Sequence, residues 1–278
     1  MQDVIRYYEE TWLDYRALWT DKRSRAMHFG YYADGAASHA DALLNTNNVL
    51  ANLARVTPGD HVLDAGCGVG GSSCWLAQHR GARCVGITPV PIQVRKARAL
   101  AASRAVEHAA QFVCGDFTQT PFRDGAFEVV WALESLCHAP DKKRFYREAA
   151  RATRSGGRLV VAEYMRSARP SSAHAEAMLR TWCAGWSMPD LDTVEEHRQA
   201  ACDAGFTNVQ VQDFTPVVSR SLRRLYRFAR LAGPLDALLY GLKLRSARQH
   251  GNVVASRLQY EALLQGHWSY CILSANKP

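Results

Sequence analysis

The sequence predicts an α/β fold in which a doubly wound, mostly parallel seven-stranded sheet is covered by helices on both faces. From about residue 60, short β-branched runs alternate with longer stretches of helical spacing, which is the pattern of such a sheet. The chain has 278 residues with 47% hydrophobic content, enough for one large core with an added cap. We therefore expect a single core.

Seven segments have the length and composition of strands. They are residues 61–64, 83–87, 111–114, 127–131, 158–164, 208–214 and 268–275. Helices are expected at residues 70–79, 91–104, 141–153 and 193–204. The last helix has Thr193 as its cap and two glutamates in its first turn, where the helix dipole favours negative charge. The stretch around Trp182 and Trp186 is predicted to be irregular.

Four segments follow from this order of elements. Residues 49–216 form the core, residues 267–278 supply its last strand, and residues 217–266 form a basic helical cap inserted before that strand. Residues 1–48 precede the sheet and are rich in aromatic side chains. They form either an amphipathic helix packed on the surface or a helical lid over the ligand cleft, because open α/β sheets bind ligands at the carboxyl ends of their strands.

Composition limits the classes of partner and compartment. The net charge of +8 suits an anionic partner such as nucleic acid, a membrane surface or a phosphorylated small molecule. Many basic residues fall in the cap at helix-like spacing, which favours a folded basic face over a nucleic-acid tail. No apolar run approaches the ~18 residues that span a bilayer, so we expect a cytoplasmic protein. The eight cysteines lack C-x-x-C spacing, which predicts neither a zinc site nor a redox pair.

A glycine-rich turn follows the first strand, with the sequence Asp-Ala-Gly-Cys-Gly-Val-Gly-Gly at residues 64–71. Glycines at 66 and 68 let the backbone bend sharply and approach a ligand, because a Cβ there would clash. A dinucleotide site would have G-x-G-x-x-G here, whereas this turn offers glycines at 66, 68, 70 and 71. Asp64 would repel a pyrophosphate, whereas it suits the ammonium group of a methionine moiety.

Four motifs, in this order, resemble the class I S-adenosylmethionine-dependent methyltransferases, which have a Rossmann-like fold, over residues 45–215 and 268–278. The motifs are residues 62–70, Cys-Gly-Asp-Phe at 114–117, Gly-x-Phe-x-Val-Val at 125–130 and Arg-Ser-Gly-Gly-x-Leu at 154–159. The resemblance implies S-adenosyl-L-methionine as the cofactor, with Asp116 accepting a hydrogen bond from the adenine amino group. The implied cofactor-binding residues are Asp64, Gly66, Gly68, Thr88, Gln93, Asp116, Phe117 and Leu133.

One departure from the family pattern concerns the second strand. Most members end it with an acidic residue that holds the ribose, whereas this chain has Thr88 in the string Gly-Ile-Thr-Pro-Val-Pro-Ile-Gln at 86–93. That string resembles the tocopherol and sterol C-methyltransferases and the bacterial prenyl-diphosphate C-methyltransferases, which implies that Thr88 and Gln93 contact the adenosine. The alternative is that Thr88 forms a turn and Gln93 is solvated. The W-x-x-E-S-x-x-H-x-x-D-K spacing at 131–142 is similar to the same subgroup.

The loop at 131–142 contains the candidates for acceptor chemistry. Methylation of an alkene carbon makes a carbocation, which aromatic rings stabilise and a carboxylate can deprotonate. The resemblance implies that Glu134 is this base; its structural alternatives are capping the next helix or pairing with a lid residue. His138 is a second catalytic candidate, either a proton shuttle or a buried packing residue. The aromatic candidates for substrate contact are Trp12, Tyr15, Trp19, Tyr31, Trp131, Trp182 and Trp186.

The basic cap offers a further substrate contact. A prenyl diphosphate carries several negative charges, and arginine binds phosphate oxygens bidentately, so Arg220, Arg223 and Arg224 are candidates for a clamp. A solvated helix face and attraction to a membrane are the alternatives. No cluster has metal-ligand spacing, so we expect no protein metal site, and any Mg²⁺ would arrive on the diphosphate.

Three functions are therefore open. The first is C-methylation of an isoprenoid such as farnesyl or geranyl diphosphate, through a carbocation deprotonated by Glu134. The second is O-, N- or aromatic C-methylation of another lipophilic metabolite, such as a phenol, quinone or sterol. The third is a nucleic-acid methyltransferase or a non-catalytic binding module. No N-P-P-Y or D-P-P-Y string follows the fourth strand, so we expect a small lipophilic partner, no nucleic acid, and either a monomer or a homodimer.

Overall fold

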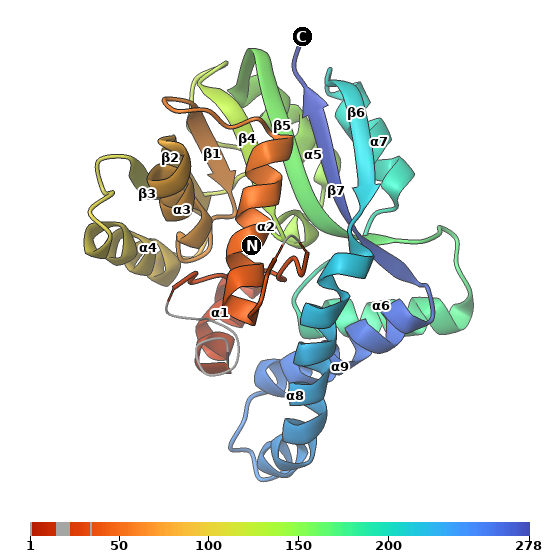
Figure 1. Ribbon diagram of the computed structural model, residues 1–278. Coiled ribbons are helices and arrows are strands. Elements are labelled where there is room, and N and C mark those ends of the chain that lie inside the picture. Colours follow the sequence, from red (N-terminus) through yellow and green to blue (C-terminus); the bar gives the residue numbers. More distant parts are fainter. Residues whose placement is uncertain (1, 15–22, 34) are drawn as a thin grey trace.

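The computed structural model describes residues 2–14, 23–33 and 35–278 and contains one seven-stranded sheet (Figure 1). The strand order is β3-β2-β1-β4-β5-β7-β6, with β7 antiparallel to both of its neighbours and the other pairs parallel. The strands are β1 (His61–Ala65), β2 (Arg83–Thr88), β3 (Ala110–Cys114), β4 (Phe127–Leu133), β5 (Thr153–Arg166), β6 (Thr207–Asp213) and β7 (Trp268–Asn276). The predicted α/β fold is confirmed.

Helices cover both faces of the sheet, as the alternation of strand residues requires. Val129 and Val160 face a core that includes Leu50 of α2 (His39–Leu53) and Leu76 of α3 (Gly71–Arg80). The neighbouring residues on these strands face the opposite core, beneath α5 (Lys142–Ala152) and α7 (Val194–Asp203). Helix α4 (Pro91–Ser103) begins at Pro91, whose fixed backbone suits the first helical position, and packs on β3.

A cap of three helices lies beyond the carboxyl ends of the parallel strands (Figure 1). It consists of α6 (Ala173–Gly185), α8 (Thr215–Gly241) and α9 (Ala247–Leu264), with α1 (Gln2–Asp14) against α9. The cap therefore contains more than residues 217–266, because α6 packs closely on α9. A Cβ on Gly185 would lie 2.4 Å from the carbonyl oxygen of Gly251, so the two helices meet at their glycines.

The prediction of an irregular segment around Trp182 and Trp186 was wrong. Ser172 caps α6 by accepting a hydrogen bond from the backbone of Ala175, and the buried residues that follow have helical spacing. Trp182 lies inside this helix and Trp186 is its C-terminal cap. Among the described helices, none is both long enough and apolar enough to cross a membrane.

Candidate active site

The first cavity lies at the carboxyl ends of β1, β2 and β4 and has a volume of about 350 Å³. The glycine turn after β1 forms its floor. Gly66 has a φ of +88°, and a Cβ there would lie 2.2 Å from Cβ of Ser135. Gly70 has a φ of +82°, and its Cβ would meet the ring of Phe112 at 2.7 Å. Because no side chain fits at either position, the turn packs against its neighbours and leaves the space above it open.

Asp64 is the last residue but one of β1 and lies just before this turn. Its carboxylate accepts a hydrogen bond of 2.5 Å from the Ser73 hydroxyl, and burial raises its pKa to about 6. A cation placed in the cavity would restore the ionised form by Coulombic attraction. This environment suits the ammonium group of an amino-acid ligand.

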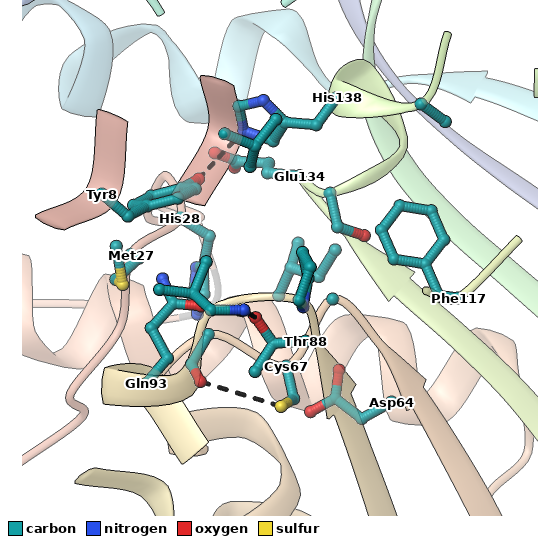
Figure 2. A pocket seen from close by; sticks show the side chains of 18 of the residues that line it. Tyr8, Met27, His28, Asp64, Cys67, Thr88, Gln93, Phe117, Glu134 and His138 are labelled. Carbon is teal, nitrogen blue, oxygen red and sulfur yellow. Dashed lines mark hydrogen bonds between the residues drawn. The ribbon is translucent and has the colours of Figure 1, made fainter. Parts of the chain in front are cut away.

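The ends of β2 and β3 contribute polar groups with fixed orientation. The Thr88 hydroxyl donates to Oε1 of Gln93 at 2.6 Å, so that Gln93 can offer its N–H donors to a ligand (Figure 2). Both residues are buried, which excludes the interpretation of Gln93 as a solvated helix residue. Asp116 accepts two hydrogen bonds from Thr118 through Oδ1, which fixes the turn and leaves Oδ2 as a further acceptor site.

The structure brings all eight predicted cofactor-binding residues together around this cavity, here called the donor cavity. They are Asp64, Gly66, Gly68, Thr88, Gln93, Asp116, Phe117 and Leu133. The open glycine turn, the buried carboxylate of Asp64, the amide donors of Gln93 and the carboxylate acceptor of Asp116 fit the methionine, ribose and adenine parts of S-adenosylmethionine. Their individual contacts with the cofactor stay predictions.

A second cavity of about 180 Å³ lies between the sheet, α1 and the cap, and is called here the acceptor cavity. Its wall is mostly apolar and aromatic. The contributing side chains are Tyr7, Phe29, Cys137, Tyr164, Trp186, Met188, Leu225, Phe228, Ala229, Ala232, Leu235, Leu239 and Val253. Tyr8, Met27, Glu134 and His138 line both cavities. Figure 2 shows Tyr8, Glu134 and His138 at one end of the donor cavity, with Asp64, Thr88 and Gln93 at the other.

Glu134 is the first residue after β4 and has a φ of +50°, a strained backbone for a residue with a side chain. Its Oε1 accepts from the Phe29 backbone N–H and from the Tyr270 hydroxyl, both at 2.8 Å. Its Oε2 accepts from the Tyr164 hydroxyl. Burial raises the pKa of the carboxyl to about 8. Glu134 therefore pairs with a residue of the N-terminal segment and does not cap the next helix, which Asp141 caps.

His138 belongs to the 3₁₀ turn η2 (Leu136–His138). Its Nδ1 lies 3.3 Å from the carbonyl oxygen of Ser187, which can only accept, so Nδ1 carries the proton. Its Nε2 then accepts from the Tyr8 hydroxyl at 2.9 Å. Burial lowers the pKa of His138 to about 4, which keeps the ring neutral and leaves a basic lone pair on Nε2.

Most of the predicted substrate aromatics lie elsewhere. Trp186 lines the acceptor cavity, whereas Trp131 and Trp182 are fully buried in the core behind it. Tyr31 packs against Phe214, outside both cavities. The ring of Trp12 lies 4.1 Å from the ammonium of Lys96 on α4 and lines neither cavity. Tyr15 and Trp19 lie outside the described residues.

The predicted arginine clamp does not form at either cavity. Arg220 stacks over Tyr32 and Arg224 over Phe228, while Arg223 donates to the Tyr260 hydroxyl. None of the three arginines lines either cavity. Among the described residues, the arginine that lines the acceptor cavity is Arg245, in the turn between α8 and α9. Across the part of the chain that the structure describes, no group of three or more histidine, cysteine or carboxylate side chains could hold a metal ion.

Sequence reasoning missed the residues that enclose Glu134. Tyr164 and Tyr270 pair directly across β5 and β7, so their common position could have been found from strand register. Met27 and Phe29 lie in an irregular segment without periodicity, and no sequence pattern points to them.

Comparison with known proteins agrees with this geometry. Residues 63–161 match the family described as "Methyltransferase domain". The 27-O-demethylrifamycin SV methyltransferase of Amycolatopsis mediterranei is 31% identical over 187 residues, covering 67% of this chain and 68% of that protein. The chain belongs to the class I S-adenosylmethionine-dependent methyltransferases.

Within that class, tocopherol and sterol enzymes are among the proteins that this chain resembles. Chloroplastic tocopherol O-methyltransferase of Arabidopsis thaliana is 35% identical over 191 residues, 64% of this chain. The 24-methylenesterol C-methyltransferase 2 of the same plant is 31% identical over 192 residues, 68% of this chain. The aligned region spans about half of each plant protein, 53% in both cases. A geranyl diphosphate methyltransferase structure has a TM-score of 0.75 at 20% identity, covering 100% of this chain and 99% of that one, and supports the fold alone.

Proposed function

We propose that this methyltransferase alkylates a carbon atom of an isoprenoid acceptor, with Glu134 as the base that removes the proton afterwards. The observation that carries the proposal is the position of the Glu134 carboxyl. It lies where the donor and acceptor cavities meet, among aromatic side chains, with three hydrogen bonds that fix its orientation.

The chain's own residues supply three functions for such a reaction. When bound, S-adenosylmethionine provides an electrophilic methyl group on a sulfonium. The rings of Tyr8, Phe29 and Trp186 exclude water from the acceptor and offer their faces to a carbocation on it, each contributing about 0.5–2 kcal/mol. Either carboxylate oxygen of Glu134 can then take the proton next to the cationic carbon. Tyr164 and Tyr270 hold that carboxylate in place.

The acceptor cavity favours an uncharged isoprenoid over a prenyl diphosphate. Arg245 lines this cavity, and its guanidinium group lies 2.7 Å from the carboxylate of Asp14 and 2.6 Å from the carboxylate of Asp236. Both aspartates also line the cavity. The charged side chains described there therefore bring more negative than positive charge. A diphosphate, with or without Mg²⁺, would need these ion pairs to be exchanged. Farnesyl and geranyl diphosphate are accordingly test substrates beside neutral sterols and prenylated phenols.

One observation favours a second candidate, O- or N-methylation of a lipophilic metabolite. His138 is neutral, and its Nε2 lone pair is bonded by Tyr8 at the boundary of the two cavities. An acceptor hydroxyl that displaced the Tyr8 hydroxyl could give its proton to Nε2 during methyl transfer. In O- or N-methylation, His138 would be the base. Glu134 would then have a structural role, holding the residues of the cavity wall in place.

The test incubates the protein with donor labelled in the methyl group and the acceptor panel, followed by product mass spectrometry. Glu134→Gln should lower turnover by about 10²–10⁴-fold with a C–H acceptor, while His138→Gln lowers it less. Donor binding, measured by calorimetry, should be retained in both variants. Label on oxygen or nitrogen, together with turnover that survives Glu134→Gln and fails in His138→Gln, would instead establish the second candidate.

A further inference from the structure

The second half of α8 is apolar on two faces. Its inner face lines the acceptor cavity through Ala232 and Leu239. Its outer face carries leucines at intervals of four, three and four residues, which places them in one row. These are Leu231, Leu235, Leu238 and Leu242, with exposed fractions of 81%, 60%, 59% and 60%. These four leucines together are called here the leucine tip.

The leucine tip lies at the end of the cap that points away from the sheet (Figure 1). An exposed apolar patch of this kind on a folded protein marks a surface that meets another apolar surface. The leucine tip is not part of the core of the cap, because the buried residues of α8 lie on another side of the helix.

Cations surround the leucine tip. Arg227 lies one turn before Leu231 in the same row, Arg230 is adjacent, and Lys243 lies between two of the exposed leucines. All three are exposed, and within the described ranges none forms an ion pair with a carboxylate, whereas Arg245 and Arg248 are paired with α1. The one carboxylate among residues 227–244, that of Asp236, is 4% exposed and paired with Arg245. The patch is therefore an apolar centre with a basic rim.

The acceptor cavity reaches this surface. Leu235 is 60% exposed and also lines the cavity, so the wall of the cavity continues into the leucine tip. A surface that touched a lipid bilayer here would place the cavity next to the apolar phase in which lipophilic compounds dissolve.

We propose that the leucine tip docks the protein on an anionic lipid bilayer, with its leucines in the interface and Arg227, Arg230 and Lys243 against the lipid phosphates. A helix with an apolar row and basic neighbours binds in this manner without spanning the membrane. A second copy of the chain fits less well, because a two-fold contact would bring each basic rim close to its own copy. Docking requires neither donor nor acceptor, so it is tested independently of methyl transfer.

The experiment measures co-sedimentation of the full chain with vesicles of phosphatidylcholine alone and of phosphatidylcholine mixed with phosphatidylglycerol. We expect binding to the mixed vesicles that weakens at high salt. The double variant Leu231→Ser/Leu238→Ser should lower the partition coefficient by about tenfold or more, because two apolar side chains are lost from the interface. Neutralising Arg227, Arg230 and Lys243 with glutamine should lower it by a similar factor.

Matched controls distinguish binding through the leucine tip from nonspecific binding of the protein to vesicles. Leu264→Ser removes a leucine that is 69% exposed at the far end of α9, and it should leave vesicle binding unchanged where Leu238→Ser lowers it. Replacing Arg83, Arg95 and Arg123, which are exposed on the sheet domain, with glutamine should have a much smaller effect than neutralising the rim. Absence of vesicle binding, or equal loss in the controls, overturns the proposal. Self-association in light scattering that Leu231→Ser/Leu238→Ser abolishes, without vesicle binding, would identify a second copy as the occupant and also overturn it.

Discussion

The donor and acceptor cavities share four of the described residues, yet they are built in different ways. Every residue predicted for the donor cavity lies on it, and each comes from the carboxyl end of a parallel strand or from the turn or helix that directly follows one. The acceptor cavity combines α1, the segment around Phe29, the end of β5 and three cap helices, which are far apart in the sequence. A site formed by the topology of the sheet can be predicted from local motifs, whereas a site formed by packing between distant helices cannot.

The donor side is most sharply tested at Gly66. Gly66→Ala should weaken S-adenosylmethionine binding roughly 100-fold, since the new Cβ lies 2.2 Å from Cβ of Ser135 and the left-handed backbone adds strain, together about 3 kcal/mol. Calorimetry measures the affinity and thermal unfolding checks the fold.

Two variants show whether sterics cause that loss. Gly156→Ala has a similar backbone strain at φ +74° with no atom within 4 Å of the new Cβ, and should leave donor affinity unchanged. Gly66→Ala/Ser135→Gly removes the clashing Cβ and should recover part of the affinity. If the affinity is not recovered, the contact with Ser135 is not the cause of the weaker donor binding.

The acceptor side is tested by two neighbouring tryptophans of the cap. Trp186 lines the acceptor cavity and Trp182, 5.7 Å away between ring centroids, lies in the core behind it. Trp186→Phe should raise KM for the acceptor about threefold to tenfold by loss of ring contacts. Trp182→Phe should lower the melting temperature and leave KM unchanged. A selective KM effect of Trp182→Phe would contradict the position of the cavity wall.

These tryptophans also show where sequence reasoning stops. Composition identified the aromatic set, but burial depends on which face of α6 packs on α9, where Gly185 meets Gly251. The positions of the α8 arginines could not be predicted for a similar reason. Helix-like spacing predicts that basic residues form a row on one side of the helix, but it does not predict whether that side faces the cavity. The strands were predictable because alternation and glycine turns are local. Glu134 was found by its motif, whereas its partners Tyr164 and Tyr270 required the pairing of β5 with β7.

Proton release connects the two cavities. The pKa of Glu134 is about 8 because of burial, so the carboxyl is mostly protonated at pH 7.5 and must ionise before it can act as a base. A sulfonium in the donor cavity lowers this pKa by attraction, whereas the neutral thioether of S-adenosylhomocysteine does not. We expect S-adenosylmethionine to release up to about 0.7 of a proton more than S-adenosylhomocysteine at pH 7.5.

Calorimetry in buffers of different ionisation enthalpy measures this difference. In Glu134→Gln this difference should vanish. Asp64 is predicted to meet the ammonium group that both ligands share, so proton release from Asp64 should persist at lower pH. An unchanged difference in Glu134→Gln would assign the proton to another group. Because kcat/KM for the donor reports the free enzyme, it should also rise as the pH approaches 8 and fall away below it.

The smallest effect concerns the ion pairs that join α1 to the cap. Arg248 pairs with Glu10 at 2.9 Å, and both side chains are one-third exposed, so Arg248→Gln should change the free energy of unfolding by less than about 1 kcal/mol. The loss of stability should nevertheless be confined to α1. Because Tyr8 of α1 lines both cavities, hydrogen exchange in α1 should increase while exchange at the ends of β1 and β2 stays the same. Arg257→Gln, which breaks an exposed pair with Glu261 within α9, is the matched control and should leave α1 unaffected. Faster exchange throughout the sheet would mean that the acceptor wall and the donor site form one cooperative unit, against the distinction between them.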